Sequence, residues 1–253
     1  MTRDELYNFW RFEETFPFSG WDFAHLDGRW EQEPLPWDFY AEVQRRLHYA
    51  DQLLEVDTCG AFLLSLRHPY ENTAVTETWG PNVESYRNEL APLGIHVEEC
   101  DAAEEPLPFA DNAFDVAFCR HGAYRADELL RVLRPGGVFL TEQVGGRNNA
   151  LLARRLLRDY RPPCPEHHLS ADCEAFADAG FIVLDAKEYF PKLRFYDTGA
   201  LVYYAHMIEW EFPGFSVDRC EQELFALECE LAERGYVESM EHRYLIAARK
   251  PAK

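Results

Sequence analysis

Short apolar runs alternate with amphipathic stretches along the chain from about residue 52 onward. Apolar runs of strand length predict buried strands, and apolar residues spaced three or four positions apart predict helices that cover a sheet. The predicted strands are residues 52–57, 74–78, 95–100, 114–119, 138–144, 181–185 and 244–248. The predicted helices are residues 62–66, 80–94, 124–133, 148–159, 170–179 and 217–234.

Strands that alternate with helices in this way favour an α/β fold. Parallel strands need crossover connections, and the predicted helices lie where those crossovers would be, so we expect a mostly parallel sheet with helices on both faces. Pro135, Gly136 and Gly137 follow one predicted helix and Gly235 follows another. Both positions suit the ends of helices.

Residues 1–50 do not follow this pattern. Large aromatic side chains stand there among prolines and glycines, including Trp10, Trp21, Trp30 and Trp37. Such side chains are buried against the protein itself or against a ligand. We therefore expect residues 1–50 to form an aromatic N-terminal arm that either packs on the core or covers a substrate as a lid.

The charge of the chain narrows the classes of function. The chain has 253 residues with 45 acidic and 25 basic side chains, which gives a formal net charge of −20. This charge repels phosphates and disfavours nucleic-acid and anionic-membrane partners. No apolar run approaches the length of a membrane span, and the first residues lack the pattern of a signal peptide. We expect a cytoplasmic protein that acts on small molecules.

The cysteines and the common nucleotide motifs exclude several other classes. The seven cysteines are scattered without a CxxC pair, which predicts reduced thiols. The segment Cys164-Pro-Glu-His-His168 matches no standard metal spacing, so we interpret it as a surface loop and predict no metal. The chain also lacks a phosphate-binding P-loop, a G-x-G-x-x-G turn after a strand and a G-x-S-x-G elbow.

Acidic residues stand at the ends of the first three predicted strands. In an open parallel sheet the ligand crevice lies beyond the carboxyl ends of the strands. Glu55 lies near the end of the first strand, Glu77 ends the second and Asp101 follows the third. An acid about 20 residues after the first strand binds ribose hydroxyls in many nucleoside-binding sheets. Glu77 has this position.

The segment 52–144 resembles a class I S-adenosylmethionine-dependent methyltransferase of the type-11 group. The motifs that carry the resemblance are Leu53-Leu-Glu-Val56, Asp101-Ala-Ala-Glu-Glu-Pro-Leu-Pro-Phe109, Phe114-Asp-Val116 and Leu133-Arg-Pro-Gly-Gly137. The resemblance implies a Rossmann-like, seven-stranded, mostly parallel sheet whose last strand is antiparallel. It also implies one α/β domain over residues 51–253, with a substrate-side insertion at about 190–215.

The resemblance further implies that S-adenosylmethionine is the cofactor. By position, Glu77 would bind the ribose hydroxyls, Asp101 and Ala102 would hold the adenine, and Arg120 and His121 would lie beside the methionine half. The predicted cofactor-binding residues are Glu55, Asp57, Thr58, Cys59, Gly60, Ala61, Glu77, Thr78, Asp101, Ala102 and Arg120. His121 is either a general base for the acceptor or a histidine hydrogen-bonded to the backbone.

The loop after the first strand departs from the family's pattern. The family has acid-x-Gly-x-Gly-x-Gly, whereas this chain has Glu55-Val-Asp-Thr-Cys-Gly-Ala61. Glycines in such loops allow unusual backbone angles and a close approach to the ligand. An aspartate at position 57 adds bulk and negative charge, so the sequence predicts that cofactor binding is weakened or reorganised.

The sequence therefore predicts methyl transfer from S-adenosylmethionine to a small-molecule acceptor. Two alternatives stay open: a methyltransferase-fold protein that binds a ligand or partner without catalysis, and an RNA methyltransferase, which the net charge disfavours. Aromatic and histidine side chains would contact a fairly apolar acceptor. These candidates are Trp30, Tyr124, Tyr203 and His206. The sequence does not decide whether the protein forms a homodimer.

Overall fold

The computed structural model describes residues 1–18, 22–57 and 61–252. The chain divides into two compact units, each built from segments that are distant in the sequence. The first, which we call the α/β unit, contains residues 36–144, 167–188 and 244–253. The second, which we call the helical unit, contains residues 1–35, 145–166 and 189–243.

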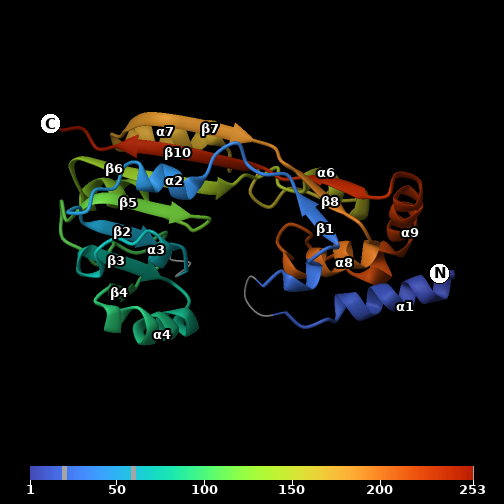
Figure 1. Cartoon of the computed structure of the whole chain (residues 1–253). Helices are drawn as coiled ribbons and strands as arrows, with labels where there is room; N and C mark the ends of the chain where they lie inside the picture. Colours follow the sequence, from blue (N-terminus) through green and yellow to red (C-terminus); the bar gives the residue numbers. More distant parts are fainter. Residues whose placement is uncertain (19–21, 58–60, 253) are drawn as a thin grey trace. The chain divides into compact units, whose positions relative to one another are not determined.

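Within the described residues, seven strands of the α/β unit form one sheet in the order β4-β3-β2-β5-β6-β10-β7. The pairs β2–β3, β3–β4, β2–β5 and β5–β6 are parallel. Figure 1 shows that β10 runs opposite to its neighbours β6 and β7. The strands are β2 (Leu53–Val56), β3 (Thr73–Glu77), β4 (His96–Glu99), β5 (Phe114–Arg120), β6 (Leu133–Val144), β7 (Ile182–Tyr189) and β10 (Arg243–Arg249). The predicted seven-stranded, mostly parallel sheet is confirmed.

Helices cover both faces of this sheet because successive strand residues point to opposite sides. Leu53 packs into a core with Phe39 and Leu63, whereas Leu54 packs into a core with Leu129 and Phe176. These partners come from different helices. The helices of the α/β unit are α2 (Phe39–Gln44), α3 (Ala61–Ser65), α4 (Gly80–Glu89), α5 (Ala126–Val132) and α7 (Leu169–Ala179).

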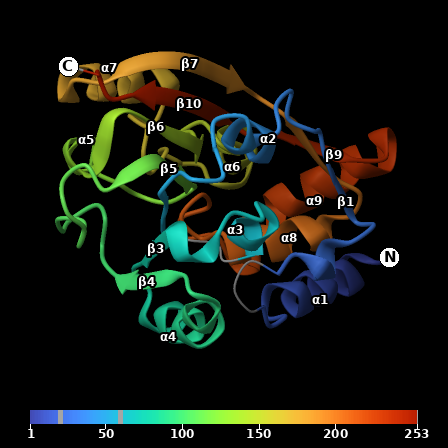
Figure 2. The same ribbon diagram turned by 60° about the vertical axis from the view of Figure 1, so that its left-hand side comes forward.

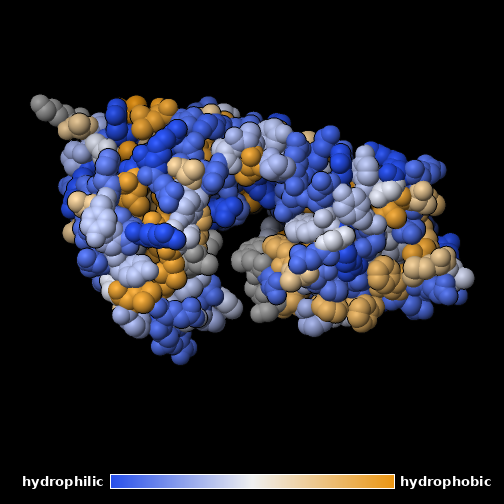
Figure 3. Space-filling model, in the orientation of Figure 1, coloured by the Kyte–Doolittle hydropathy of each residue, from blue (hydrophilic) through white to orange (hydrophobic). Residues whose placement is uncertain are grey.

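A helix lies beside each edge strand of the sheet. Figures 1 and 2 show α4 beside the edge strand β4 and α7 beside the edge strand β7. On β7, Ile182 and Leu184 are exposed, and apolar surface is visible there along the upper edge of Figure 3.

None of the helices in the described parts of the chain has the length and apolar character needed to cross a membrane.

The helical unit has a small antiparallel sheet with the strand order β1-β8-β9. Its helices α1, α8 and α9 contact one another, and α6 packs on α9 and β9. On α9, Val217, Cys220, Leu224 and Leu227 are buried, as the predicted apolar stripe requires. The elements are β1 (Trp30–Gln32), β8 (Lys192–Phe195), β9 (Val237–Met240), α1 (Arg3–Glu14), α6 (Ala150–Leu156), α8 (Thr198–Met207) and α9 (Val217–Arg234).

The observed division of the chain differs from the expected arm at 1–50 and insertion at 190–215. Strand β1 pairs with β8, which places Trp30 opposite Phe195 and joins residues 1–35 to residues 189–243 in one unit. Residues 36–50 instead belong to the α/β unit, where α2 contributes Phe39 to the core. The long-range strand pairing therefore creates a separate unit in place of an arm and a short insertion.

Candidate functional site

Three carboxylates gather where neighbouring strands of the α/β unit end. Asp57 directly follows β2, Glu77 is the last residue of β3, and Asp101 lies two positions beyond β4. Because β2, β3 and β4 are parallel neighbours, their carboxyl ends share one edge of the sheet. The charges of Glu77 and Asp101 both act on the carboxyl group of Asp57. The expectation that these strand ends lie together is thus met in the structure.

Glu77 is buried, and its carboxylate organises the turn into α4. Its Oε1 accepts hydrogen bonds from the backbone N–H groups of Thr78 and Trp79, both at 2.9 Å. Its Oε2 accepts a hydrogen bond of 3.1 Å from the side-chain amide of Asn82. The three bonds together fix the orientation of the Glu77 carboxylate at the start of α4.

Asp57 occupies the place of the first family glycine and keeps a glycine-like backbone, with φ at 56°. Its N–H donates a hydrogen bond of 3.2 Å to Oγ1 of Thr76. Burial, followed by the charges of Glu77 and Asp101, raises the pKa of Asp57 to about 6. The backbone at this position is therefore one that glycine adopts most readily, but it carries a carboxyl group whose ionisation is opposed by its surroundings.

Gly122 is a close neighbour of Asp57 that sequence reasoning missed. A Cβ atom at Gly122 would lie 2.5 Å from Oδ2 of Asp57 and 2.6 Å from its Cβ. The backbone oxygen of Gly122 accepts a hydrogen bond of 3.0 Å from Gln143, which holds the backbone in place. Only glycine fits at this position while Asp57 is present.

The loop after β4 carries Asp101 and Ala102. Oδ1 of Asp101 accepts a hydrogen bond of 3.0 Å from the N–H of Ala103, and the hydroxyl of Thr78 donates to the backbone oxygen of Cys100 at 3.2 Å. Ala102 is buried, whereas Asp101 is half-buried. This geometry fixes the carboxylate of Asp101 next to the end of β3.

Arg120 and His121 end β5 beside the buried carboxylate of Glu142, which lies in β6. Nε of Arg120 donates to Oε1 of Glu142 at 2.9 Å, and Nε2 of His121 lies 3.5 Å from the same oxygen. Nε1 of Trp37 donates to Oε2 at 2.7 Å. Burial alone would raise the pKa of Glu142, but the His121, Arg120 and Trp37 partners lower it to about 2.

Glu142 therefore holds a negative charge that positions Arg120 and His121. The backbone of His121 has φ at 63°, a region that few residues other than glycine adopt. Strained conformations of this kind often occur at functional sites. Glu142 could have been found from the sequence in the same way as Glu77, because it is an acid near the carboxyl end of a predicted strand. The sequence prediction covered acids at the ends of the first three strands alone.

The remaining predicted cofactor residues belong to the first strand of the predicted site and to the loop that follows it. Glu55 is fully buried within β2, between Val75 of β3 and Phe118 of β5. Thr58, Cys59 and Gly60 lie outside the described residues. Ala61 begins α3, and its side chain is also outside the described part of the chain.

The predicted acceptor residues fall into both units. Tyr124 belongs to the α/β unit, where its ring packs on Phe139 and Phe176 with centroid distances of 4.9 and 5.8 Å. Burial raises the pKa of Tyr124 well above its ordinary value. Its surroundings are those of a core residue. Trp30, Tyr203 and His206 all belong to the helical unit.

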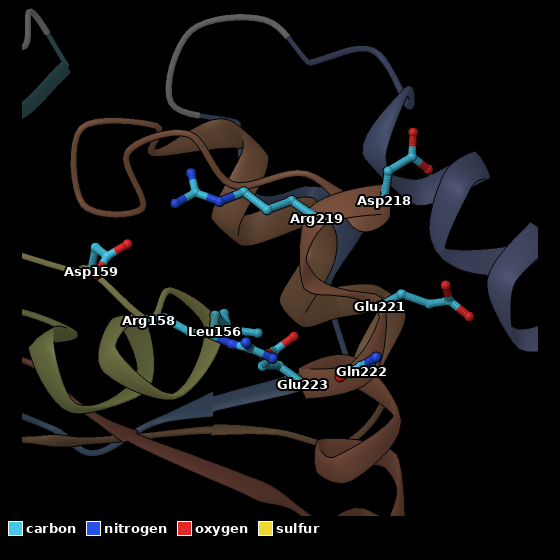
Figure 4. Close-up of a pocket in the computed structure, with 8 residues that line it drawn as sticks. All are labelled: Leu156, Arg158, Asp159, Asp218, Arg219, Glu221, Gln222 and Glu223. Atoms are coloured by element: carbon cyan, nitrogen blue, oxygen red, sulfur yellow. The ribbon is translucent and has the colours of Figure 1, made fainter.

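A cavity of about 380 Å³ lies in the helical unit between the end of α6 and the first turns of α9 (Figure 4). Charged side chains of both signs line it, and they interact with one another or with α1. Arg158 and Glu223 form an ion pair of 3.3 Å, Glu221 pairs with Arg3 of α1, and Asp218 accepts a hydrogen bond from Tyr7. These charges do not converge on a common point.

The strand order of the α/β unit, with one antiparallel strand and acids at the ends of β2 and β3, defines the class I methyltransferase fold. Residues 55–141 match the family model described as a methyltransferase domain. The α/β unit therefore has the class I methyltransferase fold, and the family match covers its first five sheet strands down to Thr141. A search among curated protein sequences finds no match.

Solved structures share this fold at low sequence identity. The YcgJ protein from Bacillus subtilis has a TM-score of 0.57 and 18% identity, covering 84% of this chain and 98% of that one. A Bacillus halodurans C-125 protein described as a candidate methyltransferase has a TM-score of 0.55 and 16% identity, with the same coverage. The [4+2]-cyclase SpnF has a TM-score of 0.50 and 20% identity, covering 85% of this chain and 81% of that one.

Proposed function

We propose that this protein transfers a methyl group from S-adenosylmethionine to a small-molecule acceptor. The observation that carries the proposal is the pair of carboxylates at the ends of β3 and beyond β4, in a domain of the methyltransferase family. Glu77 is buried, and three hydrogen bonds fix the orientation of its carboxylate. These properties fit a residue that accepts hydrogen bonds from ribose hydroxyls.

Asp101 and Ala102 fit the adenine side of the same nucleoside. The backbone bond to Ala103 fixes the Asp101 carboxylate, which can accept a hydrogen bond from an exocyclic amine. Ala102 is buried beside it, so its part in holding the adenine would come mainly from its backbone. The acidic surroundings also suit a cofactor that carries an ammonium and a sulfonium.

The bound cofactor would supply a methyl group on an already activated sulfonium. The protein then has to align the acceptor with that methyl group, which proximity and orientation can supply. For a hydroxyl or ammonium acceptor, His121 would take the proton as general base. Glu142 is a positioning residue in this scheme, because its carboxylate lies 3.5 Å from Nε2 of His121 and stabilises the imidazolium that forms.

Asp57 supports a second candidate function, in which the domain binds a ligand or partner without transferring a methyl group. Its carboxyl group stands where the family has glycine, and its charge is opposed by Glu77 and Asp101. The name of the SpnF structure, a cyclase, illustrates that this fold also occurs in proteins named for other reactions. The two candidates differ in whether a methyl group is transferred, and a failure to bind S-adenosylmethionine would favour the second.

Calorimetric titration of S-adenosylmethionine into four proteins tests the assignment of the crevice. Glu77→Gln and Asp101→Asn each remove a charged acceptor while keeping the shape of the side chain. We expect each to weaken binding by about 1.5–3 kcal/mol, or roughly 10- to 150-fold. Glu104→Gln removes an exposed acid of the same loop and is the matched control, with unchanged affinity. Unaltered affinity in Glu77→Gln would show that the crevice lies elsewhere.

A further inference from the structure

A second cavity lies within the helical unit, and one of the predicted acceptor residues, Tyr203, lines it. It has a volume of about 440 Å³ and is formed by residues 16–18, by Asp22 and the short helix η1 (Ala24–Leu26), and by α8. The residues that line it are Phe16, Pro17, Phe18, Asp22, His25 and Tyr203. Its volume suits a small organic molecule.

Aromatic rings form most of the cavity wall, and they are held against one another. Phe16 stacks on His25 with a centroid distance of 3.8 Å, and Tyr203 contacts His25 edge-on at 4.6 Å and Phe16 at 5.9 Å. Phe18 contacts His206 edge-on at 5.6 Å. Tyr203 is almost fully buried. The rings therefore form a largely preset surface, which reduces the entropy lost when a ligand binds.

Asp22 is the acidic residue of the cavity wall. Its Oδ1 accepts a hydrogen bond of 2.9 Å from the N–H of Ala24, which fixes the carboxylate at the start of η1. Among the described residues that line the cavity, none is a lysine or an arginine. The charge at the wall is therefore negative when His25 is neutral.

The charged side chains next to the wall are two carboxylates and one guanidinium, and Nη1 of Arg29 lies 3.1 Å from Nε2 of His25. Arg29 is shared between Glu13 at 2.9 Å and Asp197 at 2.6 Å, so two carboxylates surround one guanidinium. Glu13 also lies 2.7 Å from Nε2 of His25. Burial, followed by the charges of Asp22 and Glu13, raises the pKa of the Tyr203 hydroxyl. With Asp22 in the wall, three carboxylates and one guanidinium lie around the rings, so acidic side chains are in excess there.

We propose that this cavity binds a small organic cation of the alkylated ammonium type, with its alkyl groups on the rings of Phe16, Phe18 and Tyr203 and its charge facing Asp22. Aromatic faces attract such cations through their quadrupole, and a nearby carboxylate adds a counter-charge. An anion would be repelled by Asp22, and a neutral apolar molecule would gain nothing from it. The proposal does not depend on methyl transfer.

The test compares choline with 3,3-dimethylbutan-1-ol, which has the same shape without the charge, by calorimetric titration into the full chain. Cation–aromatic attraction predicts saturable choline binding that is about tenfold tighter than binding of the neutral alcohol. Equal affinity for the two molecules, or no binding of choline up to about 20 mM, would overturn the proposal.

Two variants locate the binding to the cavity. Asp22→Asn and Phe18→Ala change half-exposed or exposed positions, so the fold should be kept, and each should weaken choline binding about fivefold or more. The matched controls are Asp27→Asn, an exposed acid at the other end of η1, and Tyr196→Ala, an exposed ring of the helical unit outside the wall. If the controls weaken binding as much as the cavity variants, the cation binds elsewhere and the proposal fails.

Discussion

Replacing Asp57 by asparagine tests the electrostatics of the candidate site. Asp57 lies at φ 56°, and asparagine adopts this region more readily than most residues. Its side chain has nearly the shape of aspartate, so it can keep the packing against Gly122 while it removes the charge that faces Glu77 and Asp101. We expect Asp57→Asn to stabilise the α/β unit near neutral pH.

The size of this stabilisation follows from the raised pKa of Asp57. Burial and the two neighbouring acids raise the pKa of Asp57 to about 6. This is roughly two units above an ordinary aspartate, at about 1.4 kcal/mol for each unit. Ionising Asp57 in the folded protein therefore costs at most about 3 kcal/mol, and partial exposure to solvent reduces this to about 1–2 kcal/mol.

The raised pKa of Asp57 also determines whether the stability of the protein rises or falls with pH. The folded protein keeps the proton of Asp57 to a higher pH than the unfolded chain does, so its stability falls as pH rises between about 4 and 6. The cost is fully present above about pH 6 and absent below about pH 4. The gain from Asp57→Asn should therefore be largest near neutral pH.

Urea unfolding followed by circular dichroism measures this gain. We expect Asp57→Asn to raise the free energy of unfolding by about 1–2 kcal/mol at about pH 7.5 and by about half as much at pH 5. The exposed control Glu104→Gln should change it by less than about 0.5 kcal/mol. A gain that is the same at both pH values, or a loss at pH 7.5, would refute the electrostatic reasoning.

Two further predictions concern the same corner of the sheet. Asp57→Gly should tighten S-adenosylmethionine binding by about 1 kcal/mol in calorimetric titration, because it restores the glycine and removes charge beside the ligand; weaker binding would mean that Asp57 holds the ligand. Gly122→Ala should destabilise the protein by about 1–3 kcal/mol in urea unfolding, since its Cβ would overlap Asp57. Gly122→Ala should destabilise the Asp57→Gly protein much less than the wild type. An equal destabilisation in both proteins would mean that the added Cβ overlaps a group other than Asp57.

The α/β unit could be predicted from the sequence because its pattern is local. The strands β2, β3, β5 and the second half of β6 are apolar runs of their own, and the helices between the strands have their own apolar faces and stops. The edge strand β4 is more polar and exposed. The same regularity placed Glu55, Glu77 and Asp101 at the ends of the first three strands. In the structure Glu77 and Asp101 lie at the strand ends, whereas Glu55 is buried within β2 and Asp57 follows that strand. The seven strands were predicted from the apolar runs, and the antiparallel last strand came from the family resemblance.

The helical unit could not be predicted in the same way because long-range pairing creates it. Strand β1 has three residues, and it pairs with β8, more than 150 positions along the chain. Nothing in either segment alone specifies that partner. Helix α1 did have a local signal, the capping box of Thr2 and Glu5, which the surrounding aromatic residues obscured.

The central claim of the account is that the α/β unit binds S-adenosylmethionine at the ends of β2, β3 and β4. Thermal unfolding of the wild-type protein with and without S-adenosylmethionine, or its demethylated product, tests this most directly. A ligand at 100 times its dissociation constant adds about 2.7 kcal/mol, so the melting temperature should rise by roughly 5–10 °C. No rise at millimolar ligand would contradict the claim and favour a methyltransferase-fold protein that does not transfer methyl groups.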